Sequence, residues 1–508
     1  MASATRSSLD LTTRMGYLRM RRIDPERGVR NANARTRHCK LPTTRNQVTT
    51  SQPSTRSFAA SLAISASIAA CACQPAANAG PIRSAHAQKW FDRARTSFGQ
   101  LDIEDAQEAV QQAARHGASD EEIRLLAANI ALAKLDYEQA IRQTEGMTSS
   151  NARAVRGRAQ WYAGQVDAAG ATLHALLRDP EVHDPWAKAI ASLANQGAGR
   201  TPFRSEGDAV ASTEMPRVRS TSLVVPVEID GEQGLAVIAT GTAEVVLDRS
   251  QRRDPAWVSV RIDGRLEFRD VPAVTQDLSG ISRQLGAPIK ALLGVNFLRH
   301  ANMTFDFGAR QFVVRRFVPP RPPSATDVPL YYIRGGGMML RSSLQAIAEP
   351  PVVTLLVDSA QMFPIVLDEA GWDKAGLDPR ALSPLQGDSK VRHGVVPMIR
   401  LGTFDVPKVA GVLGTEIKPL EQALGLDVDG IIGSGLLAAF RVTLGDAGHV
   451  MWIEEEFLEP TQQPAAKGAS TQATSASGPL TPPATGPDTT LAPGANAAPT
   501  GNAKPTGK

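Results

Sequence analysis

Hydrophobic and polar positions follow two different periods along this chain, and the change between them divides it. From residue 84 to residue 195, apolar residues recur every three or four positions, and Ala, Leu, Gln and Glu are abundant. This spacing predicts amphipathic helices. From Leu223 onward, short runs rich in Val and Ile alternate with Gly turns, which is typical of strands. We therefore predict a multidomain α + β protein in which a helical region precedes an all-β region.

The helical segment contains a repeated motif. "LDIEDA" at 101–106 and "LDYEQA" at 135–140 lie 34 residues apart, and "VDAAGA" at 166–171 follows 31 residues later. This period resembles that of tetratricopeptide (TPR) repeats, which implies stacked helix pairs and a protein-binding surface. In this alignment Ala106, Ala140 and Ala171 lie where two helices approach closely, and Gly99 and Gly164 precede the first and third copies. A plain helical bundle is the alternative.

The strand-rich region is also duplicated. "ALLGVNFL" at 291–298 matches "GIIGSGLL" at 430–437, and "MTFDF" at 303–307 falls where "VTLGD" at 442–446 falls in the second copy. "DVPAV" at 270–274 and "DVPKV" at 405–409 form a third pair. Because the three pairs occur in the same order, we predict two related all-β lobes.

Each lobe resembles the retropepsin-like aspartic peptidases. That family's pattern is an apolar strand, Asp-Thr/Ser-Gly, and a strand ending Val-Leu, followed later by two hydrophobic residues and a Gly. The first lobe has Ala239-Thr240-Gly241 and then Leu292-Leu293-Gly294. The second lobe has Asp358-Ser359-Ala360 and then Ile431-Ile432-Gly433. The later Gly allows a strand to thread closely beneath the turn.

The resemblance implies a bilobal, pepsin-like domain and a role for each turn residue. Asp358 is the candidate catalytic residue, and Ala239 occupies the position of the second, missing aspartate. Thr240 and Ser359 are expected to tie the two active-site loops together through their hydroxyl groups. Gly241 and Ala360 complete the loops, although Ala360 departs from the family's glycine. In the family, two carboxylates share one proton and activate one water.

The missing carboxylate leaves two main functions open. The first is a catalytically impaired pseudo-protease that binds an extended peptide by strand addition in an interlobe cleft. The alternative is an active aspartic-type endopeptidase that uses Asp358 with an unusual second carboxylate, from elsewhere in the chain or from a second chain. A lone carboxylate titrates near about 4 and lacks a proton-sharing partner. General acid–base help is worth roughly 10²–10⁴-fold, so its loss favours the first function. A purely structural role for the β region is a third possibility.

Other chemistry has little support in the sequence. The eight His are scattered, with no His-Glu-x-x-His spacing, and there is no Gly-x-Ser-x-Gly nucleophile motif. The three cysteines, Cys39, Cys71 and Cys73, all precede the predicted domains. We therefore expect no metal site and no cofactor. Asp248 and Asp368 follow matching strand ends, where a turn or cap role is expected and an acid near the cleft is the alternative.

The excess of basic over acidic residues is confined to the beginning of the chain. Residues 1–70 carry 12 Lys and Arg against 3 Asp and Glu, whereas the remainder has a net charge of −5. The charge pattern therefore indicates no nucleic-acid partner. A 13-residue apolar run, Phe58–Ala70, precedes Cys71 and is typical of a signal peptide.

The end of that run resembles a bacterial lipobox. The resemblance implies cleavage before Cys71, lipidation of its thiol, and a membrane-anchored protein in the cell envelope. Because Ala72 follows the cysteine, we expect the periplasmic face of the outer membrane. Cleavage after Ala79, which would release a soluble periplasmic protein, is the alternative.

These patterns give the following predicted boundaries. They are a leader and signal peptide at 1–70, a lipid tether at 71–83, a TPR-like domain at 84–195, a linker at 196–220, a retropepsin-like lobe 1 at 221–318, a linker at 319–329, a retropepsin-like lobe 2 at 330–457, and a Pro-, Ala- and Thr-rich disordered tail at 458–508.

Overall fold

A computed structural model describes residues 21–22, 83–117, 119–385, 388–414 and 417–455 of this chain. The predicted signal peptide, the lipidation site Cys71 and the predicted tail lie outside the described residues. Within the described part, helices come first and a β-rich region follows, so the coarse prediction of fold class is confirmed. No helix among these residues is long and apolar enough to cross a membrane.

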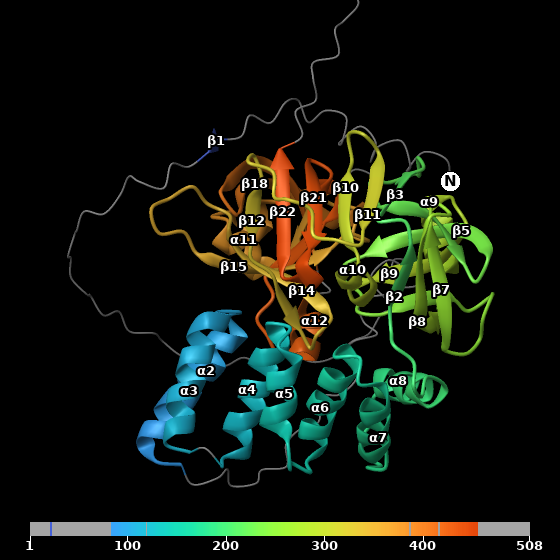
Figure 1. The fold of residues 1–508 in the computed structure, drawn as a ribbon. Coiled ribbons are helices and arrows are strands. Elements are labelled where there is room, and N and C mark those ends of the chain that lie inside the picture. The colour runs from blue at the N-terminus through green and yellow to red at the C-terminus, as the bar shows by residue number, and fades with distance from the viewer. Residues whose placement is uncertain (1–20, 23–82, 118, 386–387, 415–416, 456–508) are drawn as a thin grey trace, which may run out of the picture. The chain divides into compact units, whose positions relative to one another are not determined.

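Consecutive helices of the first region pack against one another (Figure 1). Their bounds are α2 (Ala85–Gly99), α3 (Ile103–Arg115), α4 (Glu121–Ala133), α5 (Tyr137–Thr144), α6 (Ser150–Tyr162), α7 (Val166–Leu177) and α8 (Pro185–Gln196). Side chains cap several of the first turns: those of Asp102, Asp136 and Asp184 accept hydrogen bonds from backbone N–H groups that have no partner within the helix. Apolar residues on one face of each helix supply the packing.

The structure corrects the alignment of the third helical copy. Leu101 and Leu135 adopt positive φ angles of 56° and 60° just before α3 and α5, and Gly164, at 75°, holds the same place before α7. Gly164 therefore corresponds to Leu101 rather than to Gly99. In this register Ala169 is the equivalent of Ala106 and Ala140, and all three are fully buried. Ala171, which the sequence alignment placed there, is exposed. The sequence alignment was wrong by two residues because it matched alanines and did not use the position of the helix N-cap.

The first β lobe is one sheet that folds back on itself. Its strands are β2 (Arg204–Gly207), β4 (Val224–Ile229), β5 (Glu232–Ala239), β6 (Val245–Asp248), β7 (Ala256–Ile262), β8 (Leu266–Gln276) and β9 (Ile289–Gly294). Their order is β2-β8-β6-β9-β5-β4-β7, and β7 also pairs with β8. The short helices are α9 (Ser279–Leu285) and α10 (Val295–His300).

The second β lobe repeats this arrangement with longer hairpins. Its strands are β13 (Tyr331–Ile333), β14 (Gly337–Ser343), β15 (Val352–Asp358), β16 (Ile365–Leu367), β17 (Ser383–Leu385), β18 (Asp388–Leu401), β19 (Phe404–Leu413) and β20 (Gly430–Gly433). Their order is β13-β14-β15-β20-β16-β19-β18-β17, and β1 (Arg21–Arg22) pairs with β19. The helices are α11 (Glu369–Lys374), α12 (Ile417–Leu424) and α13 (Ser434–Leu437), with single 3₁₀ turns at Pro379–Ala381 and Asp446–Gly448.

A third sheet joins the two lobes. It contains β12 (Thr326–Val328), β22 (Val450–Glu455), β21 (Phe440–Gly445), β10 (Asn302–Asp306), β11 (Gln311–Arg315) and β3 (Val210–Glu214), in that order. Strand β10 of the first lobe and β21 of the second lie side by side and antiparallel (Figure 1). Thr304 and Thr443 are directly opposite, and their hydroxyl oxygens are 2.9 Å apart. The two lobes therefore share backbone hydrogen bonds.

The segments predicted as linkers belong in part to these sheets. Strands β2 and β3 lie within 196–220, and β12 lies within 319–329. Strands β2, β3 and β12 each lie at the end of a sheet. They are short, and β2 and β3 are polar, so they lack the alternating apolar pattern that marks a strand in a sequence.

Equivalent strands of the two lobes pair in the same register. Strand β5 is parallel to β9 and places Ala239 opposite Gly294, whereas β15 is parallel to β20 and places Asp358 opposite Gly433. The matches of residues 291–298 and 303–307 with the second copy are thus confirmed. The third match is three residues out of register. Val246 pairs with Val274 and Val366 with Val412, so Asp270 corresponds to Lys408 rather than to Asp405. Both Asp270 and Lys408 have positive φ angles, of 51° and 55°.

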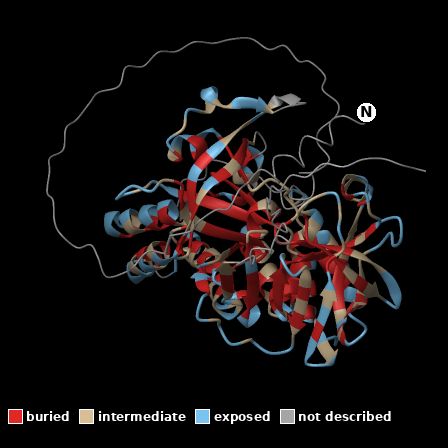
Figure 2. Cartoon of the chain, turned by 90° about the horizontal axis from the view of Figure 1, so that it is seen from above, coloured by how far each residue is buried: buried red, intermediate tan, exposed pale blue. Residues whose placement is uncertain are grey.

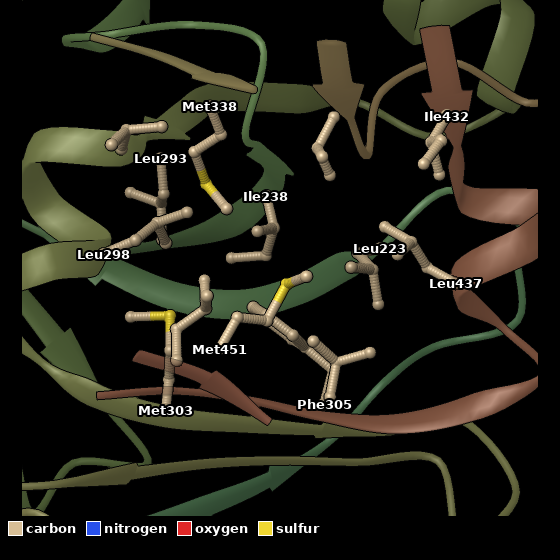
Figure 3. Close-up of a cluster of buried hydrophobic side chains, with 14 of the residues drawn as sticks. Leu223, Ile238, Leu293, Leu298, Met303, Phe305, Met338, Ile432, Leu437 and Met451 are labelled. Atoms are coloured by element: carbon tan, nitrogen blue, oxygen red, sulfur yellow. The ribbon is translucent and has the colours of Figure 1, made fainter. Parts of the chain in front are cut away.

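A continuous apolar core runs through both lobes and the shared sheet. Figure 3 shows Ile238 and Leu293 of the first lobe, Met303 and Phe305 of the shared sheet, and Ile432 of the second lobe pointing toward a common centre. All five are at most 2% exposed. Buried residues follow the strands, and exposed ones gather at hairpin ends and on the outer faces of helices (Figure 2).

The helical region contacts both lobes, and residues 83–455 fall within a single compact unit. The indole N–H of Trp257 in the first lobe donates to the carbonyl oxygen of Leu193 in α8 at 2.8 Å. On the second lobe, Arg341 forms an ion pair with Asp102 at 2.8 Å. The N-cap carboxylate of α3 therefore also anchors the helices to the β region.

Candidate functional site

Two tight turns, at the carboxyl ends of β5 and β15, meet at the junction of the lobes. The turn after β5 holds Ala239-Thr240-Gly241, and the turn after β15 holds Asp358-Ser359-Ala360. The strand register makes Ala239 and Asp358 equivalent positions. The structure therefore brings together all six residues that the sequence singled out in these loops.

Thr240 and Ser359 bind the two turns to each other by reciprocal hydrogen bonds. The Thr240 backbone N–H donates to Ser359 Oγ at 3.1 Å, and the Ser359 backbone N–H donates to Thr240 Oγ1 at 2.9 Å. Each hydroxyl then donates onward, Thr240 to the carbonyl of Val357 at 2.8 Å and Ser359 to that of Ile238 at 2.7 Å. Thr240 is 3% exposed and Ser359 is 0% exposed. Buried hydrogen bonds of this kind hold the turns rigidly, because breaking one would leave a buried backbone group without a hydrogen-bond partner.

The carboxylate of Asp358 lies against the backbone of the opposite turn. A β-carbon placed on Gly241 would be 2.6 Å from the Asp358 carboxyl carbon and 2.8 Å from each of its oxygens. Any side chain at residue 241 would therefore displace the carboxylate. Asp358 is 9% exposed, and the Ala360 backbone N–H donates to its Oδ1 at 3.0 Å. The acid is thus held in a fixed, nearly buried position.

The equivalent position in the first lobe is entirely apolar. Ala239 is 0% exposed and packs in a cluster with Val224, Val246 and Leu292. Ala360 packs against the same cluster from the second lobe. The two lobes are related by internal symmetry. The position of Ala360 relative to Ala239 is therefore expected to be the same as that of Gly241 relative to Asp358. The methyl group of Ala360 therefore lies on the side where a carboxylate at residue 239 would need space.

Ala360 does not occupy a backbone conformation that requires glycine. It is absent from the described residues with positive φ, so its methyl group is accommodated without backbone strain. The two turns thus differ in a matched way: one has Ala239 and Gly241, and the other has Asp358 and Ala360 at the equivalent positions.

The threading strands support both turns from below. A β-carbon on Gly294 would be 2.2 Å from the carbonyl oxygen of Glu244, and one on Gly433 would be 2.2 Å from that of Phe363. Glycine is therefore required for close approach in both lobes. The cavity beneath the turns, lined by Thr240 and Ser359 among apolar side chains, measures only about 10 Å³.

The two other acids considered from the sequence have structural roles. Asp368 caps α11 by accepting a hydrogen bond from the Gly371 backbone N–H at 2.7 Å. Asp248 accepts one from the Leu278 backbone N–H at 3.0 Å. The turn and cap roles predicted for both are therefore confirmed. Within the described ranges, no cluster of three His, Cys, Asp or Glu side chains is arranged to hold a metal ion.

A buried acid that the sequence analysis missed lies just after the first turn. Glu244 is 5% exposed and accepts hydrogen bonds from the Tyr162 hydroxyl at 3.1 Å and the Trp186 indole N–H at 3.0 Å. Burial raises the pKa of its carboxyl group. Because its partners come from α6 and α8, Glu244 joins the first lobe to the helices. A single acid inside the apolar run that leads into β6 was the available signal.

Comparisons with known proteins give matches at the level of structure only. No family model matches this chain, and no curated protein matches it. Among solved structures, it is similar to a retropepsin-like aspartic protease from Rickettsia conorii at 15% identity, over 27% of this chain and 95% of that one, with a TM-score of 0.20. It is also similar to Basic 7S globulin from soybean at 8% identity, over 50% of this chain and 95% of that one, with a TM-score of 0.33. Because both scores are low, the relation between the lobes rests on the strand register and turn hydrogen bonds described above.

Proposed function

We propose that this chain is an aspartic-peptidase-like protein that has lost peptidase activity and binds an extended peptide between its two β lobes. The observation that carries the proposal is the matched pair Ala239 and Ala360. A methyl group stands where the second lobe has a carboxylate, and the methyl group of Ala360 on the opposite turn packs against the same apolar cluster.

The chemistry of the site follows from this pair. An aspartic dyad needs two carboxylates close enough to share a proton, because two like charges at that distance cannot both ionise. In the first turn, the position equivalent to Asp358 holds Ala239, which has no carboxylate. The turns themselves are held by the Thr240 and Ser359 hydrogen bonds. The hydrogen bonds that hold the two turns are thus present, whereas a pair of equivalent carboxylates is not.

An active endopeptidase is the second candidate, and one observation favours it. Asp358 is kept at the catalytic register and lies over Gly241, as a working carboxylate would. Such an enzyme would need a second carboxylate from another part of the chain or from a second copy. Its activity would depend on Asp358 and would be blocked by a transition-state analogue.

A peptidase assay separates the two candidates. The purified chain is incubated with a mixed peptide library between pH 3 and pH 7, with and without a statine-containing peptide inhibitor. We expect no cleavage by the wild type, and weak acid-dependent cleavage by the double variant Ala239→Asp/Ala360→Gly. Robust wild-type cleavage that Asp358→Ala abolishes would establish the endopeptidase instead.

Peptide binding needs its own measurement, because an inactive protein need not bind anything. The statine-containing peptide is titrated into the wild type and into Gly241→Val, whose side chain displaces the Asp358 carboxylate. We expect the wild type to bind and the variant to lose at least tenfold in affinity. Equal affinities, or no binding by either, would exclude a peptide site at the turns.

We also propose that the helical region is a TPR-like repeat that binds a protein partner. The three helix pairs α2–α3, α4–α5 and α6–α7, followed by α8, support this proposal because their second helices begin at matched positions with buried Ala106, Ala140 and Ala169. A pull-down tests this proposal. The intact chain is used as bait and is compared with a variant chain that carries charge reversals on the exposed faces of α2 and α4.

Location is a further part of the proposal. The apolar run before Cys71 supports export and lipidation at this cysteine, with anchoring to the envelope. Mass spectrometry of the mature N-terminus should find a diacylglyceryl group on Cys71. An unmodified chain that begins at Gly80 would instead indicate a soluble periplasmic protein.

A further inference from the structure

A second site lies away from the two turns, where the helical region meets the first lobe. A cavity of about 250 Å³ is bounded by the end of α6, by the segment Arg200–Phe203 and by one face of α10. A single water needs only roughly 10–15 Å³ of such space, so the cavity is large enough for a small organic molecule. Neither Asp358 nor any other residue of the two turns lines it.

Arg299 of α10 lines this cavity and is a buried cation with no counter-ion among the residues that the structure describes. It is 7% exposed. Among the described residues, no carboxylate forms an ion pair with it, and its Nε has no hydrogen-bond acceptor. The guanidinium carbon lies 5.2 Å from the ring centre of Tyr137 and 5.7 Å from that of Tyr162. Burial lowers the pKa of Arg299 to about 10, so the group is still charged at neutral pH.

Asn296 lies one turn before Arg299 on the same helix and also lines the cavity. It is 2% exposed, and neither its Nδ2 nor its Oδ1 makes a hydrogen bond of normal geometry in the described structure. Burial raises the pKa of Glu244 and of Tyr162, and the Asn296 amide is nevertheless close enough to both groups to offset part of this rise through hydrogen bonding. Residues three apart lie on one face of a helix, so the amide and the guanidinium face the same space. Buried polar groups are almost always hydrogen-bonded, so two such groups at one cavity indicate a polar ligand.

The remaining walls are apolar and positively charged. Trp161, Tyr162, Phe203 and Pro272 supply flat or aliphatic surface, and no Asp or Glu is among the lining residues. The second cation, Arg200, is already engaged by Asp270 at 2.5 Å. The Arg299 guanidinium, which no carboxylate of the described residues pairs with, therefore matches one negative charge on a ligand, and the apolar walls match an apolar group.

We propose that this cavity binds a small carboxylate that carries a flat, apolar group. The Arg299 guanidinium would hold the carboxylate through two parallel hydrogen bonds, the Asn296 amide would bond one of its oxygens, and the aromatic walls would cover the apolar group. The carboxylate belongs either to a free organic acid or to the C-terminus of a short peptide. This site does not depend on the function proposed for the two turns.

Calorimetric titration of the full chain tests the proposal. The probes are N-acetyl-phenylalanine, its amide, the tripeptide Gly-Gly-Phe with a free or an amidated C-terminus, and inorganic phosphate. We expect each acid to bind at least tenfold more tightly than its amide, and phosphate to bind more weakly than the better acid. The stronger of the two acids identifies the source of the carboxylate.

Three variants show where the probes bind. Arg299→Gln should reduce the affinity for the acids at least tenfold and abolish the preference over the amides. Arg156→Gln is the matched control, because that half-buried arginine is satisfied by the carbonyls of Thr144 and Met147 and lies outside the cavity. Ala163→Leu fills the cavity from its wall without touching the charge, and should also abolish binding.

Three results would contradict binding of a carboxylate at this cavity. Equal binding of acids and amides, binding that survives both Arg299→Gln and Ala163→Leu, or no binding of any probe by the wild type up to millimolar concentration would overturn the proposal. If Arg299→Gln fails to fold, the result with Ala163→Leu decides.

Discussion

The two β lobes differ most at the point where they are structurally most alike. Both place a tight turn over a threading strand, and both close on a glycine that admits a carbonyl oxygen within 2.2 Å of a would-be β-carbon. Yet the first turn holds Ala239 and Gly241, whereas the second holds Asp358 and Ala360. The acid and the glycine are found on opposite turns, where they face each other. The difference leads us to expect that residues 239 and 360 act as a pair across the interface, as Asp358 and Gly241 do.

The largest expected effect comes from placing an acid at residue 239 alone. Ala239→Asp would put a second carboxylate into an apolar cluster, beside Asp358 and against the methyl group of Ala360. An uncompensated buried charge costs about 3–5 kcal/mol. We expect urea unfolding at pH 7 to show a loss of this size, and a smaller loss near pH 4, where the pair can hold a shared proton.

The double variant Ala239→Asp/Ala360→Gly is the comparison for that measurement. It should recover part of the lost stability, because removing the methyl group opens the space. A single variant as stable as the wild type, or a double variant less stable than the single, would show that residues 239 and 360 do not face each other.

The second prediction concerns the hydrogen bonds that make the turns alike. Thr240→Val keeps the shape of the side chain but leaves the Ser359 backbone N–H and the Val357 carbonyl without their partner. Each unsatisfied buried group costs about 1–3 kcal/mol. We expect a loss of about 2–4 kcal/mol in the free energy of unfolding. Thr242→Val, two residues along the same turn, is the control and should change it by less than about 0.5 kcal/mol. Equal losses would mean that the turns are not held by these hydroxyls.

The third prediction uses the glycines of the threading strands. Gly294→Ala and Gly433→Ala should destabilise the protein to a similar degree, by about 1–3 kcal/mol, because each methyl group meets a fixed backbone carbonyl. Gly234→Ala is the control: its β-carbon would meet only the flexible side chain of Lys290. Thermal unfolding of the three variants is the measurement. A cost confined to one lobe would contradict the internal symmetry.

The smallest effect is expected at Glu244, which has no counterpart at the end of the second turn. Its folded-state pKa is raised by burial, so the wild type loses stability as pH rises from the unfolded-state pKa through the folded-state pKa. Glu244→Gln should therefore be more stable than the wild type at pH 8, by about 1.4 kcal/mol for each unit by which the pKa is raised, and should lose this advantage near pH 4. An advantage that is independent of pH would show that ionisation of Glu244 is not the cause.

Much of the candidate site could be predicted from the sequence because its motifs are local. The Thr-Gly and Asp-Ser turns, the Leu-Leu-Gly and Ile-Ile-Gly strands and the duplication depend on residues close together in the chain. The failures have physical reasons as well. The third helical copy was misaligned because alanine is common and only the N-cap fixes the register. The match of Asp270 with Asp405 was wrong because it was based on identical residues, whereas the equivalence of positions is set by strand pairing.

By itself, the sequence determined the order of helices and strands, the duplication, and the difference between Ala239 and Asp358 at equivalent positions of the two lobes. These features follow from periodicity and from turn residues, which act over a few neighbouring positions. Only the tertiary structure decided that Ala360 packs against the cluster that contains Ala239, that Glu244 joins the first lobe to the helices, and that Arg299 and Asn296 line one cavity. The partners in these arrangements are distant in the chain and come together only when separate elements pack, so no local pattern records them.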